Sequence, residues 1–129
     1  MARKVLGKRA AGHNFSQGVI APPGRLVFVS GQAARGHDGQ IVAEGDVEGQ
    51  IRYVFQRIDE ILREDGGSLD DVVKITTFMI DIDMYEIFNR VRADVFGDDF
   101  PASSAFAVTA LVEPEFLVEV EAIAILPNG

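Results

Sequence analysis

The first regular pattern in the chain is a short run of β-branched and aromatic residues at positions 26–30. Pro22-Pro23-Gly24 precedes this run and Gly31 follows it, and breakers on both sides are typical of a buried strand. We expect an earlier strand at 16–20, which would make the Pro-Pro-Gly segment the loop of a hairpin. A glycine-rich loop follows the second of these strands.

From Asp46 onward, apolar residues recur at steps of three and four, which predicts a helix of about 18 residues. Asp46 is a suitable N-cap, and Gly66-Gly67 ends the helix. A short capped turn at 68–71 comes next. A second helix begins near Met84 and is broken at 97–101. The apolar stripe of the first helix consists of Val47, Ile51, Val54, Phe55, Ile58, Ile61 and Leu62, and that of the second of Met84, Ile87, Phe88, Val91, Val95 and Phe96.

Three further strands are expected at 72–80, 105–111 and 117–126, where the chain is apolar and rich in β-branched residues. The short loop that contains Pro114 favours an antiparallel hairpin between the last two strands. Two helices cannot cover both faces of such a sheet, so we expect them to pack on one face. The sequence therefore predicts a single domain over 1–129 with an α+β, two-layer sandwich fold.

The last strand carries apolar side chains on both of its faces. Alternate residues of a strand point to opposite faces. One set comprises Val118, Val120, Ala122, Ala124 and Leu126, and the other Leu117, Glu119, Glu121, Ile123 and Ile125. A chain of this length cannot cover both faces by itself, so we expect another subunit to contact the sheet.

Composition narrows the class of function. The formal net charge of −8 disfavours a nucleic-acid partner, because such binding depends largely on neutralising phosphates. The chain has no cysteine and only two scattered histidines, which excludes disulfides and thiolate catalysis and argues against a metal site. No apolar run has the length of a membrane span, and the basic start lacks the apolar region of a secretory signal. We therefore expect a cytoplasmic protein that contacts no membrane.

Three groups of residues are candidates for chemistry. Glu119 and Glu121 share a strand face with apolar neighbours, where at least one of the two carboxylates is suited to proton transfer. The alternative is an edge strand or a subunit rim, where one glutamate meets water and the other an arginine. Ser30-Gly31 ends a strand, and glycine there lets a ligand approach the backbone, although a plain strand terminus is the simpler interpretation. A third segment, Phe100-Pro101-Ala102-Ser103-Ser104, enters a strand after a helix, where two hydroxyls and several amides can bind a polar ligand or form a hydrogen-bonded turn.

Three other polar residues would not by themselves indicate a functional site. Asn89 lies on the second helix beside Phe88 and is expected at a polar rim. Lys74 sits inside an apolar strand and is expected to extend its charge to a sheet edge or a subunit interface. His13 is expected to be exposed.

Taken together, several segments resemble the RidA/YjgF family of reactive-intermediate deaminases. They are Leu26-Val27-Phe28-Val29-Ser30-Gly31-Gln32, Gly39, Gln50, Asp71-Val72-Val73-Lys74-Ile75-Thr76-Thr77-Phe78, Asn89, Pro101-Ala102 and Val118-Glu119-Val120-Glu121-Ala122-Ile123-Ala124. The resemblance implies a chorismate-mutase-like (ferredoxin-like) mixed sheet and a barrel-like homotrimer with a small-molecule cleft at each subunit interface. It also implies hydrolysis of short-lived enamines and imines without a metal or an organic cofactor, with Glu119 positioning or activating the water.

The chain departs from the family pattern at two positions. Active members usually read Pro-Ala-Arg, and their arginine clamps the substrate carboxylate, but this chain has Ser103 there. A hydroxyl cannot replace a bidentate guanidinium–carboxylate pair. Phe15 stands where the family has a pocket tyrosine, which keeps the shape and loses a donor. Other basic groups can substitute for the missing arginine, and the candidates are Arg25, Arg35 and Arg90.

The leading hypothesis is a diverged imine or enamine deaminase whose substrate lacks the α-carboxylate or carries its charge elsewhere, and is therefore not a simple 2-imino acid. Glu119 would be catalytic, and the substrate would contact Phe15, Ser30, Gly31, Asn89, Ser103, Ser104 and Ala105. The first alternative is a non-catalytic trimer that binds a small molecule as a sensor or scaffold. The second is RNA cleavage, a description that the family has also carried and that the acidic charge disfavours.

Overall fold

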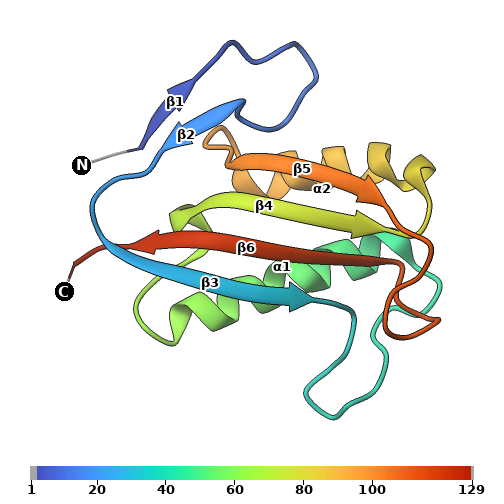
Figure 1. Ribbon diagram of the computed structural model, residues 1–129. Helices are drawn as coiled ribbons and strands as arrows, with labels where there is room; N and C mark the ends of the chain where they lie inside the picture. The colour runs from blue at the N-terminus through green and yellow to red at the C-terminus, as the bar shows by residue number, and fades with distance from the viewer. Residues whose placement is uncertain (1–2, 129) are drawn as a thin grey trace.

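A four-stranded sheet with two helices on one of its faces forms the body of the protein (Figure 1). A computed structural model describes residues 3–128 of the chain. The strands of the sheet are β3 (Arg25–Gln32), β4 (Val72–Met79), β5 (Ala102–Ala107) and β6 (Val118–Leu126), and the helices are α1 (Val47–Arg63) and α2 (Tyr85–Phe96). The predicted α+β fold with both helices on one face is confirmed.

The order of strands in the sheet is β3-β6-β4-β5. β6 is antiparallel to both of its neighbours, and β4 is parallel to β5. The expected hairpin between the last two strands is therefore wrong. α2 carries the chain from β4 back to a parallel position beside it, as a crossover helix does, and β6 then enters on the other side of β4. β5 also begins earlier than expected, at Ala102, and ends at Ala107.

The N-terminal segment forms a separate two-stranded sheet. β1 (Lys4–Leu6) pairs antiparallel with β2 (Gly18–Ile20). The earlier strand exists near the expected place, but it pairs with a strand that the sequence did not indicate, so the Pro-Pro-Gly segment is not a hairpin loop. Residue Ser16, just before β2, forms a bridge with Ala102, which attaches the segment to the free edge of β5.

Both helices begin and end where the sequence indicates. The Asp46 side chain accepts a hydrogen bond from the amide of Gly49 at 3.0 Å, which satisfies a donor in the first turn of α1. Two short 3-10 turns, Leu69–Asp71 and Ile82–Met84, precede β4 and α2. The first has the expected capping box, since Ser68 and Asp71 bond each other's backbone. α2 ends at Gly97, whose φ of 62° suits glycine.

The core lies between the sheet and the two helices. β6 presents to it the alternate residues expected from the sequence, and all of them are buried: Val118, Val120, Ala122, Ala124 and Leu126. The opposite face of the sheet is open in the single chain, and Leu26, Phe28 and Phe106 are 56%, 72% and 52% exposed. Contact of another subunit with this face stays a prediction. In residues 3–128, no helix is both long and apolar enough to cross a membrane.

Candidate functional site

Arg92 occupies a place in α2 that the helix otherwise gives to apolar residues. It follows Phe88 by four positions and Tyr85 by seven, so the three side chains lie on one face. Only 1% of the Arg92 surface is exposed, and it is the largest of the fully buried side chains. A buried guanidinium needs hydrogen-bond partners, because the loss of its hydration is costly.

Three neutral groups receive hydrogen bonds from this guanidinium. Nη1 donates to Oγ of Ser103 at 2.8 Å. Nη2 donates to Oη of Tyr85 at 3.0 Å and to Oδ1 of Asn89 at 2.7 Å. Nε is buried without a partner in residues 3–128. The donors come from one planar group, so they fix the positions of the serine and tyrosine hydroxyls relative to each other.

Aromatic rings surround the same group. The Arg92 guanidinium carbon lies 5.1 Å from the ring centre of Phe15, 5.0 Å from that of Phe88 and 5.6 Å from that of Tyr85. Ring faces attract a cation and exclude water. The arrangement therefore holds the guanidinium rigidly in a region of low polarity.

Arg92 has no acidic partner among the described residues. The groups that it bonds are a serine, a tyrosine and an asparagine, none of which carries a negative charge at neutral pH. Burial lowers the pKa of the guanidinium from its ordinary value, and the hydrogen bond to Tyr85 acts in the opposite direction. Because arginine stays protonated in proteins, this is a buried positive charge without a counter-charge.

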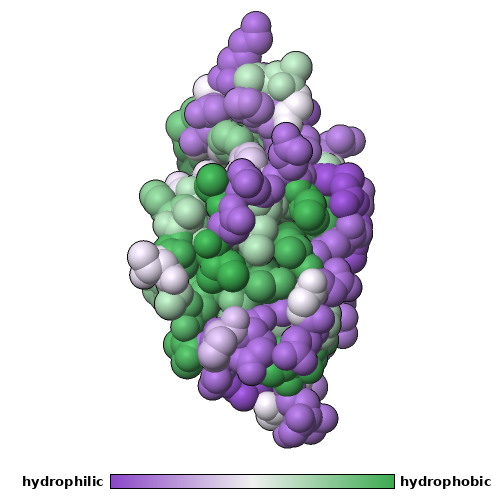
Figure 2. Space-filling model, turned by 90° about the vertical axis from the view of Figure 1, so that its right-hand side faces the viewer, coloured by the Kyte–Doolittle hydropathy of each residue, from purple (hydrophilic) through white to green (hydrophobic). Residues whose placement is uncertain are grey.

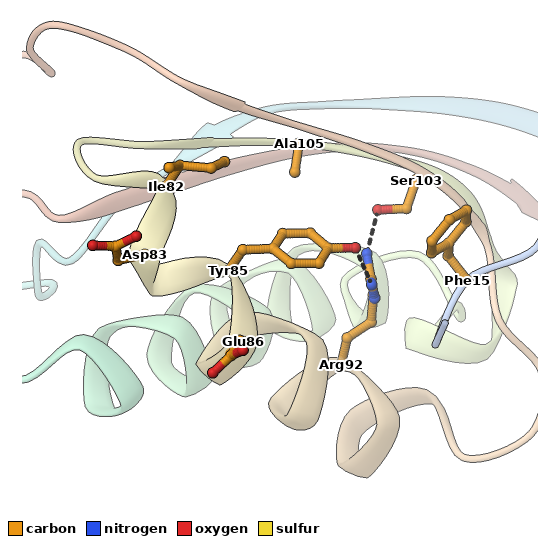
Figure 3. A pocket seen from close by; sticks show the side chains of 8 residues that line it. All are labelled: Phe15, Ile82, Asp83, Tyr85, Glu86, Arg92, Ser103 and Ala105. Carbon is orange, nitrogen blue, oxygen red and sulfur yellow. Dashed lines mark hydrogen bonds between the residues drawn. The ribbon is translucent and has the colours of Figure 1, made fainter. Parts of the chain in front are cut away.

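A cavity of about 720 Å³ lies over these groups, and we call it the Arg92 pocket (Figure 3). Tyr85 and Ser103 point toward Arg92 from α2 and β5, and Phe15 closes the side nearest the N-terminal segment. The residues that line it are Phe15, Ile82, Asp83, Tyr85, Glu86, Arg92, Ser103 and Ala105.

Asn89 fastens the N-terminal segment to this site. Its Oδ1 accepts from Arg92 and, at 3.2 Å, from the amide of Asn14, while its Nδ2 donates to the carbonyl of Gly12 at 2.9 Å. Asn14 returns a bond to the carbonyl of Asn89 at 3.0 Å. Asn89 thus orients the guanidinium and holds Phe15 over it, but does not itself line the pocket.

Glu119 lies in a different place, on the face of the sheet opposite the helices. It pairs with Phe78 of β4, whereas Ser103 pairs with Ile75, and these two β4 residues point to opposite faces. A groove of about 430 Å³ contains Glu119, and we call it the Glu119 groove. Its lining residues are Gly31, Gln32, Ala33, Arg35, Gly36, His37, Arg57, Val112, Phe116 and Glu119.

Gly31 and Glu119 are in close contact within this groove. The register between β3 and β6 shifts between Val29 and Gln32, which places Gly31 in a bulge. A side chain at position 31 would occupy the space taken by the end of the Glu119 side chain. The absence of a side chain at Gly31 therefore allows the carboxylate to rest against the backbone.

The residues expected to form one site are thus divided between two. Phe15, Ser103 and Ala105 line the Arg92 pocket, and Gly31 lines the Glu119 groove. Ser104 points to the other face from Ser103 and accepts a hydrogen bond from Lys74 at 2.9 Å. Ser30 is exposed, and its carbonyl accepts from the side chain of Gln32 at 3.0 Å.

None of the three arginines considered as substitutes lies in the Arg92 pocket. Arg25 bonds Asp65, Arg90 bonds Glu48, and Arg35 lies in the Glu119 groove bonded to Glu113. Sequence reasoning missed Arg92 because a charged residue beside an apolar stripe resembles a solvated one. Its spacing from Tyr85 and Asn89, seven and three positions, was the available signal.

Neither cavity offers an obvious metal site. In residues 3–128, no three histidine or acidic side chains are placed together so as to hold a metal ion. The polar groups that line the two cavities include hydroxyls, carboxylates, guanidinium groups and one imidazole. They suit hydrogen bonding, charge recognition and proton transfer to water.

Comparison with known proteins identifies the family. Residues 7–126 match the family model described as Endoribonuclease L-PSP. A RutC family protein of Pyrococcus abyssi is 37% identical over 101 residues, which cover 78% of this chain and 79% of that protein.

Two solved structures agree with this result over nearly the whole chain. A protein of the conserved Rid family from Yersinia pestis has a TM-score of 0.87 and 31% identity, covering 98% of this chain and 100% of its own. A member of the YjgF/YER057c/UK114 family from Mycobacterium tuberculosis has a TM-score of 0.70 and 31% identity, covering 96% and 99%. The chain belongs to the Rid/YjgF family.

Proposed function

We propose that this protein hydrolyses small reactive imines or enamines to the corresponding carbonyl compound and ammonia or an amine. The observation that carries the proposal is the Glu119 carboxylate, which rests against the backbone of Gly31 in an open groove. A carboxylate so placed has room beside it for a ligand and a water molecule. The family resemblance assigns the same glutamate the role of activating water.

The reaction needs only water as a second reactant. Glu119 accepts a proton as a water oxygen forms a bond to the C=N carbon, and the proton passes to nitrogen. The hydroxyl proton of the adduct then moves to nitrogen as the C–N bond breaks, which releases ammonia or an amine and leaves the C=O group. An enamine first gains a proton on carbon and loses one from nitrogen, which converts it to the imine.

The active form that we propose is a homotrimer with sites between subunits. Glu119 and Ser103 point to opposite faces of one sheet, so a single chain cannot direct both at one small ligand. The Arg92 pocket of one subunit beside the Glu119 groove of the next would supply both. The exposed apolar residues on the open face of the sheet, Leu26, Phe28 and Phe106, support burial against another subunit.

Figure 2 shows a second apolar area, seen from the end of the molecule where β4 and β5 finish. Green atoms are grouped in the middle of this end and reach the left edge of the view, with purple atoms above, to the right and below them. In residues 3–128, the exposed large apolar side chains outside the sheet face and the N-terminal strands are Ile80, Ile82 and Val112. Ile82 lines the Arg92 pocket, and Val112 lines the Glu119 groove. Each cavity therefore has an exposed apolar residue that is suited to contact between subunits.

The substrate no longer needs to be restricted to molecules without an α-carboxylate. That expectation rested on the lack of a guanidinium at position 103, and Arg92 brings one to Ser103 from another element. RNA cleavage gains no support from charge, because each subunit carries −8 and a trimer would carry three times that charge.

The test is ammonia release from freshly generated 2-aminoacrylate and from a neutral imine, measured above the spontaneous rate. Glu119→Gln should abolish the acceleration. Glu121→Gln is the matched control, because Glu121 points the same way from the same strand and is exposed. A protein that accelerates neither reaction would support the alternative of a non-catalytic binding trimer. Equal rates for wild type and Glu119→Gln would also refute the proposed role of Glu119.

A further inference from the structure

We propose that the hydroxyls of Tyr85 and Ser103, held and polarised by Arg92, form a receptor for the carboxylate of a small ligand. The inference deepens the proposed function: it rests on that function only for identifying the ligand as a small imino or enamino acid. The receptor differs from a direct arginine clamp, since the guanidinium acts through two hydroxyls.

The direction of the hydrogen bonds is the first reason. Each hydroxyl oxygen accepts a bond from a terminal nitrogen of Arg92, so its own proton must point away from the guanidinium. In residues 3–128 neither hydroxyl donates to a protein atom. Both side chains line the Arg92 pocket, and Figure 3 shows them pointing toward Arg92 from α2 and β5. Two O–H donors are therefore available to one ligand.

The uncompensated charge is the second reason. Arg92 is 1% exposed, bonds only neutral groups, and keeps a buried Nε without a partner in the described residues. A negative ligand next to the two hydroxyls would supply the missing counter-charge in a region where charges interact strongly. The guanidinium also withdraws electron density from both oxygens, which makes their protons better donors to an anion.

The acidic side chains of the pocket limit the shape of the ligand. Asp83 and Glu86 are exposed and lie away from Ser103, on the other side of Tyr85 (Figure 3). They would repel a second negative charge and favour a cationic or hydrogen-donating nitrogen. A small molecule with one carboxylate and one imine or amine nitrogen fits this distribution of charge.

Pyruvate and its neutral amide, pyruvamide, test the receptor without any turnover. Their binding to the assembled wild-type protein is measured by calorimetry or by amide chemical shifts. Pyruvate should bind more tightly than pyruvamide. Tyr85→Phe and Ser103→Ala should each weaken pyruvate about tenfold, the effect of losing one hydrogen bond to a charged group, and should leave pyruvamide nearly unchanged.

The neighbouring residue provides the control. Ser104→Ala removes the same hydroxyl from the same strand, but on the opposite face, and should not change pyruvate affinity. Arg92→Gln should reduce the preference for pyruvate over pyruvamide, with folding checked by melting temperature. If that variant does not fold, the two hydroxyl variants still decide the question, because neither removes a buried charge.

Three outcomes would overturn the receptor: no pyruvate binding by wild type, unchanged binding by the Tyr85→Phe/Ser103→Ala double variant, or equal losses for pyruvate and pyruvamide. The last would mean that the hydroxyls shape the pocket without recognising charge. Pyruvate binding that follows the expected pattern in a protein without imine hydrolysis would support the receptor and reject only the proposed reaction. Imine hydrolysis by a protein that does not bind pyruvate would support the proposed reaction and reject the receptor.

Discussion

The backbone of Gly31 lies directly against the carboxylate of Glu119. A methyl carbon added at Gly31 would stand 2.8 Å from Cδ of Glu119 and closer still to Oε2. The atoms in the way belong to the end of a flexible side chain, so a larger residue would move the carboxylate without forcing the strands apart. Position 31 therefore controls where the proposed catalytic group lies.

Gly31→Ala should lower Glu119-dependent imine hydrolysis by about tenfold or more, because small displacements of a catalytic group are costly. Stability should change by less than about 1 kcal/mol, since the glycine does not need a positive φ. The measurements are the rate of ammonia release and the melting temperature. Gly18→Ala is the control, because a methyl there meets only Leu6 at 3.5 Å. Unchanged activity in Gly31→Ala would show that the position of the carboxylate does not matter.

The open face of the sheet is where we expect another subunit to pack, so a charged residue introduced there should prevent formation of the trimer. Phe28 is 72% exposed in the single chain and lies opposite Ile123 on that face. Phe28→Asp should convert a trimer to monomers, because an aspartate cannot be buried in an apolar interface without a partner. Light scattering would measure the mass, and circular dichroism should show an intact fold.

Gln56→Asp is the control for this change, since Gln56 is exposed on α1, on the other side of the sheet. It should leave the mass unchanged. A wild-type protein that is already monomeric at micromolar concentration would contradict the proposed assembly, as would a trimer that tolerates Phe28→Asp.

Gln50 predicts a stability effect that is independent of function. Its fully buried side chain donates to the carbonyls of Ala43 at 3.3 Å and Glu115 at 2.9 Å, and accepts from the amide of Leu117 at 2.9 Å. Gln50→Leu would leave the Glu115 carbonyl and the Leu117 amide without these partners, whereas Ala43 keeps its bond from the amide of Asp46. The loss should lower the free energy of unfolding by about 2–4 kcal/mol. Urea denaturation measures the loss.

A matched substitution on the same helix distinguishes the loss of buried hydrogen bonds from the effect of replacing glutamine by leucine. Gln56→Leu makes the same chemical change where the side chain is exposed, and its effect should stay within about 0.5 kcal/mol. Similar losses for the two variants would mean that the hydrogen bonds of Gln50 are not what stabilises the segment before β6.

An ion-pair cluster on the helices predicts a small dependence of stability on pH. Hydrogen bonds from Arg90 and Arg52 lower the pKa of Glu48 below its ordinary value of 4.5. A lowered folded-state pKa means that the contribution is present above 4.5 and is lost as the pH falls through the lower folded value. Glu48→Gln should thus be less stable than wild type near neutral pH, and the difference should vanish in acid.

The measurement is the urea midpoint of both proteins at about pH 7 and about pH 3, at low salt. The effect should be small, because all three side chains are at the surface, and high salt should reduce it further. Glu44→Gln, in the exposed loop before α1, is the control. A difference that grows as the pH falls would contradict the sign of the shift.

Local signals in the sequence were sufficient to predict the helices and most of the strands. Asp46 and Gly66 bound α1 because capping depends on residues within one or two turns. β5 was placed too late because Ser103 and Ser104 are polar and lie on an edge strand, where the apolar pattern is weak. The position of β6 between β3 and β4 depends on pairing between distant segments, which no local pattern encodes.

The candidate site was predictable only in part, for a similar reason. Phe15, Ser103 and Ala105 do line one cavity, and Gly31 lies beside Glu119, as the family pattern suggests. Glu119 and Ser103 point to opposite faces of the sheet because of the register between β4, β5 and β6. Local sequence does not encode that register. Arg92 reaches the cavity from α2, so its role appears only when helix and sheet are seen together.

The central position of β6 also determines how this protein can fold. β3 and β4 do not pair with each other, and both are joined to the sheet through β6, whose Ala124 pairs with Val27 from near the other end of the chain. A fragment that ends before β6 contains only one pair of this sheet, the parallel β4 and β5, and β3 has no partner in it. Acquisition of structure should therefore be cooperative and comparatively slow, as is typical of chains dominated by contacts between remote segments. A mutation that delays docking of this strand would leave the whole core, and not one corner of it, open to aggregation.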